Sequence, residues 1–179
     1  MTQRIDALLR KNRAAVADFA AAASAVAIDA WQTPLAAGKW SPAQHVDHVS
    51  RAYAAAVLEI VHDSPMRLIG SPAQRRRWRL IGLTLVRWLG RLPRGAPAPR
   101  EIRPPERLDL GRPQLLAELD GHVRDFEVAI QSIASDGKRG FTHPYFGALS
   151  ARDGVRLLAV HTRHHERALR AVLARSSAH

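Results

Sequence analysis

Two histidines four residues apart are the strongest chemical feature of the sequence. His161 and His165 lie in a helical pattern that runs from Ser150 to about Arg175. Residues four apart share one face of an α-helix, and both histidines fall on the apolar row that contains Leu158 and Leu169. Two imidazoles on a face that should be buried need partners. The same spacing lets one helix donate two nitrogens to a metal ion.

A third histidine is available in another helical pattern. His45 and His48 lie three residues apart in the segment Trp40–His62. The apolar row of that segment lies closer to His45, so spacing alone does not choose between them. Three imidazoles from two helices would leave open positions on a divalent ion for water and substrate. His164 lies toward one edge of its apolar row, so we expect it at the rim of the site.

The composition excludes several other kinds of site. The chain has 179 residues, 46% of them hydrophobic, and no cysteine. A disulfide framework, a thiolate zinc finger, an iron–sulfur cluster and a cysteine nucleophile are therefore ruled out. A chain of this length buries enough surface to fold as one domain without disulfide bonds or structural metal ions. Any transition metal must use carboxylates or the nine histidines.

No carboxylate has a position that requires it to act as a general base, so the catalytic residues stay unassigned. We expect most acidic side chains to be solvated, and Asp47 or Glu166 to orient metal ligands. The candidates for a base are Asp47, Glu59, Glu118, Asp120, Asp125 and Glu127.

Four long segments predict an all-α fold. They span about residues 3–28, 42–62, 113–135 and 150–175. The second begins with Ser41-Pro42-Ala43-Gln44, which predicts a capping box with proline at the first helical position. Ser150 and Asp153 predict a similar cap for the fourth segment. No segment shows sustained alternation of apolar and polar residues, so we expect an antiparallel four-helix bundle without a sheet.

Residues 65–112 do not fit this plan, and we expect them to form an insert within a single domain spanning residues 1–179. Seven arginines and no acidic residue lie between Arg75 and Arg94. The net charge is +11, so these seven leave only +4 for the remaining residues. The first part predicts a basic amphipathic helix, and a proline-rich strap follows from Pro93 to Pro113. The residues predicted to share the apolar face of this helix are Trp78, Ile81, Leu85, Trp88, Leu89 and Leu92.

The insert has three interpretations. Segment 75–92 could contact an anionic membrane surface, because tryptophans and leucines opposite arginines suit the lipid interface. It could bind nucleic acid, although no recognition motif accompanies the arginines, so nucleic acid is not the expected partner. It could also fold back as a lid or a dimer element over the open end of the bundle. We favour the last interpretation.

The N-terminal region bears on localisation. No uncharged stretch is long enough for a spanning helix. The alanine-rich segment 14–28 resembles the core of a signal peptide, but Asp18 interrupts it and Asp6 lies among the basic residues ahead of it. We therefore expect a cytoplasmic protein.

Two motifs resemble the DinB/YfiT-like superfamily. The run Trp40-Ser41-Pro42-Ala43-Gln44-His45-Val46-Asp47-His48-Val49 is similar to the start of that family's second helix, where a metal-binding histidine follows a tryptophan by eight residues. The run His161-Thr162-Arg163-His164-His165 resembles its fourth-helix HxxxH pair. The resemblance covers the whole helical plan and says least about residues 65–112.

The resemblance implies an up-down-down-up four-helix bundle with a divalent metal ion, zinc or nickel. It implies that His48, His161 and His165 hold this ion, and it selects His48 over His45 against the apolar row. It also implies a homodimer. The implied activity is a metal-dependent thiol S-transferase or hydrolase that acts on a small-molecule substrate, with a low-molecular-weight thiol as a co-substrate.

Two alternatives to an enzyme stay open. One is a non-catalytic bundle whose metal site is structural or vestigial, in which His45 or His164 closes the site as a fourth ligand. The other is a membrane-surface or nucleic-acid-associated module that uses the segment Arg75–Arg94. An enzyme requires a metal site that is open to solvent.

Overall fold

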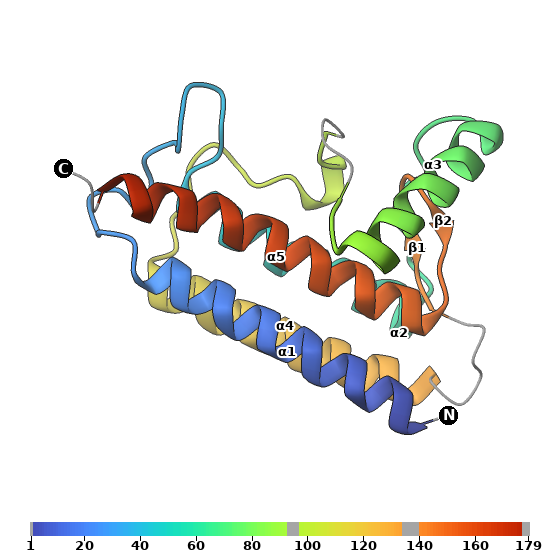
Figure 1. Ribbon diagram of the computed structural model, residues 1–179. Coiled ribbons are helices and arrows are strands. Elements are labelled where there is room, and N and C mark those ends of the chain that lie inside the picture. Colours follow the sequence, from blue (N-terminus) through green and yellow to red (C-terminus); the bar gives the residue numbers. More distant parts are fainter. Residues whose placement is uncertain (1, 93–96, 134–139, 177–179) are drawn as a thin grey trace.

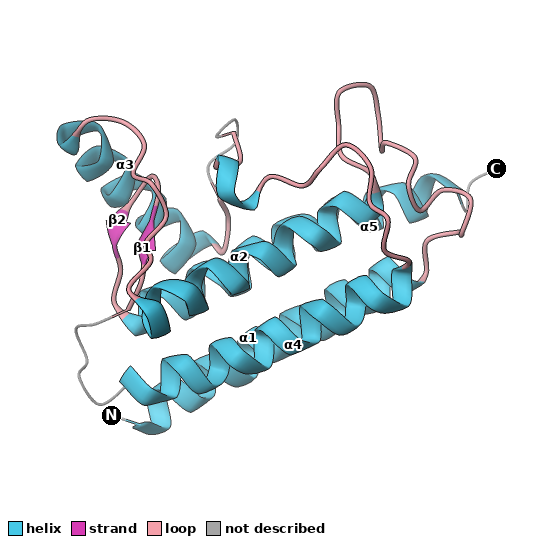
Figure 2. Cartoon of the chain, turned by 180° about the vertical axis from the view of Figure 1, so that it is seen from behind, coloured by secondary structure: helices cyan, strands magenta, loops and turns pink. Residues whose placement is uncertain are grey.

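Four long helices packed side by side make up the body of the molecule (Figure 1). The computed structural model describes residues 2–92, 97–133 and 140–176. The four helices are α1 (Thr2–Ser24), α2 (Pro42–His62), α4 (Arg112–Ile133) and α5 (Ala151–Ser176). Helices α1 and α5 run in one direction and pack along each other, whereas α2 and α4 run in the other and pack together (Figure 1 and Figure 2). This arrangement confirms the predicted all-α, up-down-down-up bundle.

Local capping signals determine where α2 and α5 begin. The Ser41 hydroxyl accepts a hydrogen bond from the Gln44 amide, and the Gln44 side chain accepts one from the Ser41 amide. The hydroxyl of Ser150 likewise accepts from the Asp153 amide. Both predicted caps are confirmed, because each depends only on residues three positions apart. Helix α2 also ends at His62, as predicted.

The end of α1 differs from the prediction. The apolar pattern predicts a helix to Ile28, but α1 ends at Ser24 and Ile28 is 77% exposed. Arg112 donates a hydrogen bond of 2.8 Å to the carbonyl oxygen of Ser24. Its guanidinium also lies 4.8 Å from the ring of the buried Trp31. A residue from the start of α4 thus satisfies the last turn of α1, a contact that local sequence cannot predict.

One further segment differs from the prediction, and one predicted helix end is not covered by the described residues. A hairpin of two-residue strands, β1 (Thr142–His143) and β2 (Gly147–Ala148), precedes α5, although no strand is predicted. Strands this short contain too few residues to show an alternating pattern. The predicted end of the third helix at about residue 135 lies outside the described residues, within which α4 spans Arg112–Ile133.

The described part of the insert lies outside the four-helix body. It contains α3 (Pro72–Thr84), the π-helical turn η1 (Leu85–Leu89) and the 3₁₀ turn η2 (Arg100–Ile102), and residues 93–96 of the predicted strap lie outside the described residues. The strap crosses the start of α2, where the Gln44 side chain donates to the carbonyl oxygen of Pro105. No helix within the described ranges combines the length and the apolar character needed to span a bilayer.

The predicted apolar face of the insert does not act as one unit. Leu83 and Val86 are buried against the bundle, whereas Ile81, Trp88 and Leu89 are exposed. The wider turn at η1 changes the rotation per residue, so a regular helical wheel does not apply beyond Thr84. The structure therefore corrects the predicted face.

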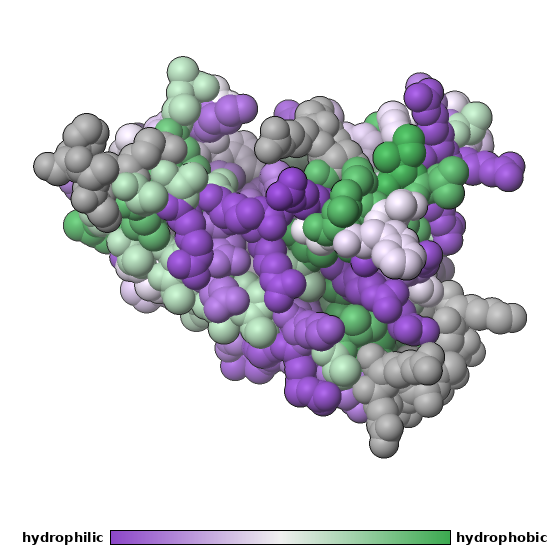
Figure 3. Space-filling model, in the orientation of Figure 1, coloured by the Kyte–Doolittle hydropathy of each residue, from purple (hydrophilic) through white to green (hydrophobic). Residues whose placement is uncertain are grey.

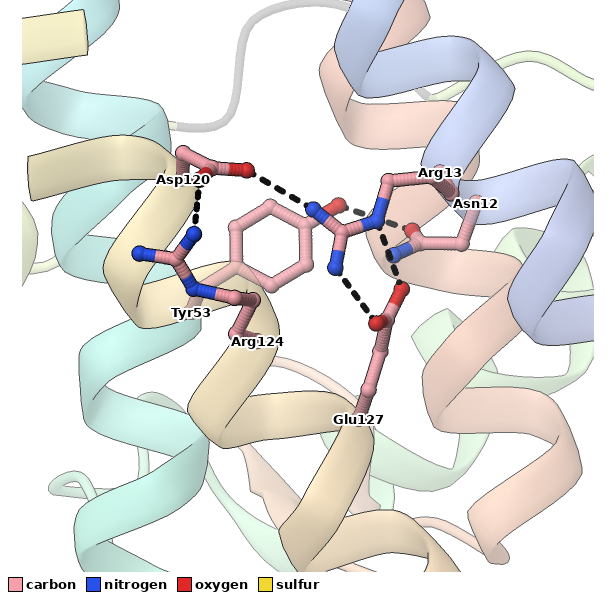
Figure 4. A network of polar contacts seen from close by, with 6 residues as sticks. All are labelled: Asn12, Arg13, Tyr53, Asp120, Arg124 and Glu127. Atoms are coloured by element: carbon pink, nitrogen blue, oxygen red, sulfur yellow. Dashed lines mark hydrogen bonds and ion pairs between the residues drawn. The ribbon is translucent and has the colours of Figure 1, made fainter. Parts of the chain in front are cut away.

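Polar contacts join all four long helices, and Figure 4 shows those that involve α1, α2 and α4. The buried Tyr53 hydroxyl donates to the side-chain oxygen of Asn12 at 2.7 Å and lies 3.1 Å from the Thr162 hydroxyl. Nearby, Arg13 binds Glu127 through two nitrogens, and Asp120 through a third contact of 2.8 Å. These contacts hold α1, α2, α4 and α5 in register beside the histidines.

We expect Tyr53→Phe to lower the free energy of unfolding by about 1–3 kcal/mol, because Asn12 and Thr162 lose a buried partner. Urea unfolding of the two proteins measures this loss. Tyr145→Phe is the matched control, since the Tyr145 hydroxyl donates to the Pro97 carbonyl at an exposed position. Equal losses in both variants would contradict a special role for the buried network.

Candidate metal centre

Helices α2 and α5 lie side by side and bring three histidines together. His48 comes from α2, two turns after its cap, and His161 and His165 come from the middle of α5. One nitrogen from each ring lies within 4.8 Å of the other two. His48 and His165 are buried, whereas His161 keeps partial access to solvent.

The Nε2 atom of His161 is at the centre of this group. It lies 3.0 Å from Nε2 of His48 and 3.1 Å from Nε2 of His165. The three rings meet nearly edge to face, with interplanar angles of 65°, 71° and 81°. Three imidazole nitrogens therefore point at a common space between α2 and α5.

The strap orients His48. Nδ1 of His48 lies 2.7 Å from the carbonyl oxygen of the buried Ile102, which follows it by 54 residues. Since a carbonyl only accepts, Nδ1 carries the proton and a neutral His48 presents a lone pair at Nε2. This is the tautomer that a metal ligand needs.

His45 orients His165 in a similar way. The Nδ1 atoms of the two rings lie 2.7 Å apart, on the edge of His165 that faces away from the group. His45 therefore contacts a ligand candidate without joining the group. His164 is exposed, with its ring centroid 5.2 Å from that of His165, and also lies outside the group. Among the described residues, no fourth histidine or carboxylate closes the site.

Burial keeps these imidazoles neutral at pH 7. It lowers the pKa of His48 to about 4, although the hydrogen bond to Ile102 and the charge of Asp47 act in the other direction. Burial, followed by the neighbouring histidines, lowers the pKa of His161 and His165 well below the ordinary value. Trp40 contributes to this burial, since its ring lies 4.6 Å from that of His48 and stacks on His165 at 6.1 Å. Neutral rings keep their lone pairs available for a cation.

The proton positions leave a conflict that a cation would resolve. His48 has no proton at Nε2, and a single N–H on His161 Nε2 can be directed at only one of its two neighbours. At least one of the two short N···N contacts therefore cannot be a hydrogen bond between neutral imidazoles. Nδ1 of His161, which carries the proton when Nε2 offers its lone pair, is buried and has no hydrogen-bond partner among the described residues. A cation among three lone pairs fits this donor set.

A family model described as the DinB superfamily matches residues 8–169, which is most of the chain. The chain belongs to the DinB superfamily. The comparison with curated proteins found no match.

A solved structure shows the same fold as this DinB-superfamily chain. It is YfiT from Bacillus subtilis, described as "a probable metal-dependent hydrolase with an unusual four-helix bundle topology". The TM-score is 0.63 and the identity 15%, over 99% of this chain and 90% of that chain. At this identity the likeness concerns the fold.

A small cavity of about 50 Å³ adjoins His161. Its lining is mostly apolar and comes from α2, the insert, the hairpin and α5. Besides His161, the lining residues are Ala52, Met66, Leu92, Ile102, Phe141, His143, Pro144, Leu157 and Leu158. A larger hollow of about 200 Å³ lies beside Glu59 and Thr142 and is lined by none of the three histidines. Of these two hollows, the smaller one adjoins the histidine group of this DinB-superfamily chain.

The structure gives structural partners to four of the six acidic candidates. Both oxygens of Glu59 accept hydrogen bonds from Thr142. Asp47 pairs with Arg51 at 2.6 Å. Asp120 and Glu127 belong to the Arg13 network, and Glu118 and Asp125 are exposed on α4. Glu166 pairs with Arg170.

Sequence reasoning missed two parts of the site. The Ile102 carbonyl belongs to a strap without any motif, so no signal could have identified it. His143 lies in the aromatic segment 141–146, which the sequence indicates only as a loop that packs on the bundle or borders a pocket. Its position in the cavity beside His161 depends on the hairpin.

Proposed function

We propose that this chain is a metal-dependent enzyme, a hydrolase or thiol S-transferase, that acts on a small molecule. His48, His161 and His165 are the proposed ligands of a divalent ion, zinc or nickel. The observation that carries the proposal is the close approach of the Nε2 atoms of three neutral imidazoles, where the available protons do not satisfy both short N···N contacts. Family membership and the fold of YfiT support it.

The surrounding residues favour a catalytic site over a closed structural one. A divalent ion held by three imidazoles lowers the pKa of a bound water or thiol toward neutrality and so supplies a nucleophile. His48 and His165 are held by Ile102 and His45, so their rings are preorganised. The partly exposed His161 leaves one side of the site accessible. Within the described chain, no fourth ligand occupies that side.

The cavity limits the substrate and supplies a hydrogen-bond donor. A volume of about 50 Å³ holds a few water molecules or a short apolar group. His143 accepts a hydrogen bond from the Tyr145 amide at Nδ1. Its neutral ring therefore carries a proton at Nε2, and we propose that this N–H orients a polar atom of the substrate.

The test compares the zinc-loaded, nickel-loaded and chelator-treated full chain with His161→Ala. One assay follows hydrolysis of p-nitrophenyl acetate, and another follows transfer of cysteine to 1-chloro-2,4-dinitrobenzene. In the second, an S–C bond forms, the C–Cl bond breaks, chloride leaves and the thiol proton passes to solvent. We expect a metal-dependent rate that His161→Ala abolishes.

The outcomes separate the alternatives. A rate in only one assay assigns the reaction class. A protein that binds about one ion per chain but accelerates neither reaction would favour the non-catalytic bundle. The proposed homodimer is tested separately by sedimentation of the loaded protein.

We expect His45→Ala to weaken metal binding by about 10–100-fold while the stoichiometry stays the same, because His165 loses the partner that orients it. Calorimetric titration with Zn²⁺ measures the change in Kd. His164→Ala is the matched control, since His164 also adjoins His165 but lies outside the group. Complete loss of the ion in His45→Ala would instead assign His45 as a ligand.

A further inference from the structure

The outer surface of α3 and η1 exposes a row of large apolar side chains. Trp88 is 82% exposed, Leu80 73%, Leu89 63% and Ile81 47%. Single exposed apolar residues are ordinary on soluble domains, but a contiguous group indicates a surface that binds a partner. Figure 3 shows hydrophobic residues gathered over α3, with hydrophilic ones along the edges. We call these four residues the α3 outer face.

The inner side of the same segment is attached to the bundle. Gly82 allows α3 so near the hairpin that an added Cβ would lie 2.5 Å from the Phe146 ring. Arg87 binds the carboxylate of Asp153, at the start of α5, through two nitrogens. Trp78 packs edge-on against Tyr145. The segment is thus held in place, and its outward side chains are not needed for its own packing.

The α3 outer face is surrounded by uncompensated positive charge. The sequence has no acidic residue from 64 to 100. Arg76, Arg77 and Arg79 are exposed, and no carboxylate of the described residues lies within ion-pair distance of them. Arg91 is exposed just beyond η1. A partner for this surface must therefore offer both an apolar layer and negative charge.

We propose that the α3 outer face binds an anionic lipid surface. Tryptophan, leucine and isoleucine enter the boundary between headgroups and acyl chains, and the arginine guanidiniums reach the lipid phosphates. Both ribbon views place α3 at a corner of the molecule, on the side of α2 and α5 that faces away from α1 and α4 (Figure 1 and Figure 2). A flat surface can therefore reach α3 without meeting the long faces of α1 and α4. This inference does not depend on the proposed metal chemistry.

The same features disfavour the other partners. A second copy packed through this face would bring the arginines of one chain against those of the other, with no acidic residue on the segment to neutralise them. A nucleic acid would neutralise the arginines, but its phosphate backbone would not bury the exposed side chains of Leu80 and Leu89. An anionic lipid bilayer satisfies the charge and the apolar row together.

The experiment is sedimentation of the full chain with vesicles of phosphatidylcholine alone or mixed with phosphatidylglycerol. We expect binding to the mixed vesicles only, and weaker binding at high salt. Leu80→Gln/Trp88→Gln should lower partitioning at least about tenfold. Arg76→Gln/Arg77→Gln/Arg79→Gln should lower it about a hundredfold, because each arginine near an anionic surface contributes about a factor of five.

Matched variants control for changes in hydropathy and net charge. Ile28→Gln/Val128→Gln removes two exposed apolar side chains elsewhere, and Arg10→Gln/Arg163→Gln/Arg167→Gln removes three exposed arginines from α1 and α5. Both controls should bind vesicles like the parent chain. All variants should keep the parent helix content by circular dichroism and the parent metal content.

Three results would overturn the proposal. One is equal binding to neutral and anionic vesicles. Another is a self-association, measured by sedimentation velocity, that Leu80→Gln/Trp88→Gln abolishes while vesicle binding persists. The third is binding to a single-stranded oligonucleotide, lost in the triple arginine variant, by a chain that does not sediment with vesicles.

Discussion

His161→Ala is expected to abolish binding of a divalent ion by this chain. Its Nε2 atom is the one that lies within about hydrogen-bond distance of both other ligand candidates. Removing it leaves only the nitrogens of His48 and His165 as ligand candidates. The loss of affinity should therefore exceed the roughly 10–100-fold effect of losing an outer partner such as His45.

Two measurements check this result. Mass spectrometry of the metal content should give about one ion per parent chain and none for His161→Ala, His48→Ala or His165→Ala. Added Zn²⁺ should raise the Tm of the parent chain but not of these variants, since an ion at a hundred times its Kd stabilises the folded state by about 2.7 kcal/mol. His164→Ala should behave like the parent. Metal retained in His48→Ala but lost in His45→Ala would contradict the ligand set.

The metal-free chain is expected to lose stability steeply as the pH falls below about 6.5. Five histidines have a pKa lowered by burial in the folded state, and for three of them it is about 4. Between these values the unfolded chain binds protons that the folded chain does not, so the free energy of unfolding decreases as the pH falls. Each such histidine contributes about 1.4 kcal/mol per pH unit within this window. The five are His45, His48, His143, His161 and His165.

Urea unfolding at a series of pH values from about 8 to about 5 measures this effect. The midpoint should be constant above about pH 7.5 and fall at lower pH, to the point of unfolding above pH 4. His143→Gln should reduce the pH dependence of the free energy of unfolding by the contribution of one histidine. His62→Gln is the matched control, because it removes a solvent-exposed imidazole. A midpoint that is the same at about pH 5 and pH 7 would show that the folded chain accommodates protonated histidines.

The parts of the fold that were predictable have causes within a few residues. The Ser41–Gln44 box and the Ser150–Asp153 cap each join residues three apart. The pair His161 and His165 shares a face because of the helical repeat alone. Distant contacts explain the failures. Helix α1 stops at Ser24 where Arg112 binds its carbonyl, 88 residues along the chain.

The choice between His45 and His48 shows where local reasoning ends. Helical periodicity does not choose between the two histidines. In the structure both are buried on α2. In the structure His48 points Nε2 at His161, whereas His45 contacts the far edge of His165. The difference arises from the position of α5 and from the strap that holds Nδ1 of His48. The resemblance to a family selected His48 because it carries information about packing that spacing lacks.

In the insert, too, the sequence shows the residue types, whereas packing decides which of them are exposed. Its positive charge and its tryptophans are plain in the sequence, and so is its amphipathic character. Which apolar residues are buried depends on the π-helical turn at Leu85 and on the approach of Phe146 to Gly82. The exposed row of Leu80, Ile81, Trp88 and Leu89 became visible only in the folded chain.

The sequence by itself determined the four helices, the caps of α2 and α5, the histidine pair and the basic insert, because each depends on residue types at short, regular spacing. Only the tertiary structure decided which α2 histidine faces His161, which strap carbonyl orients it and which side of α3 stays exposed. These outcomes depend on contacts between residues 54 to 120 positions apart. Helical periodicity places a side chain on a face, but packing between helices decides what that face meets.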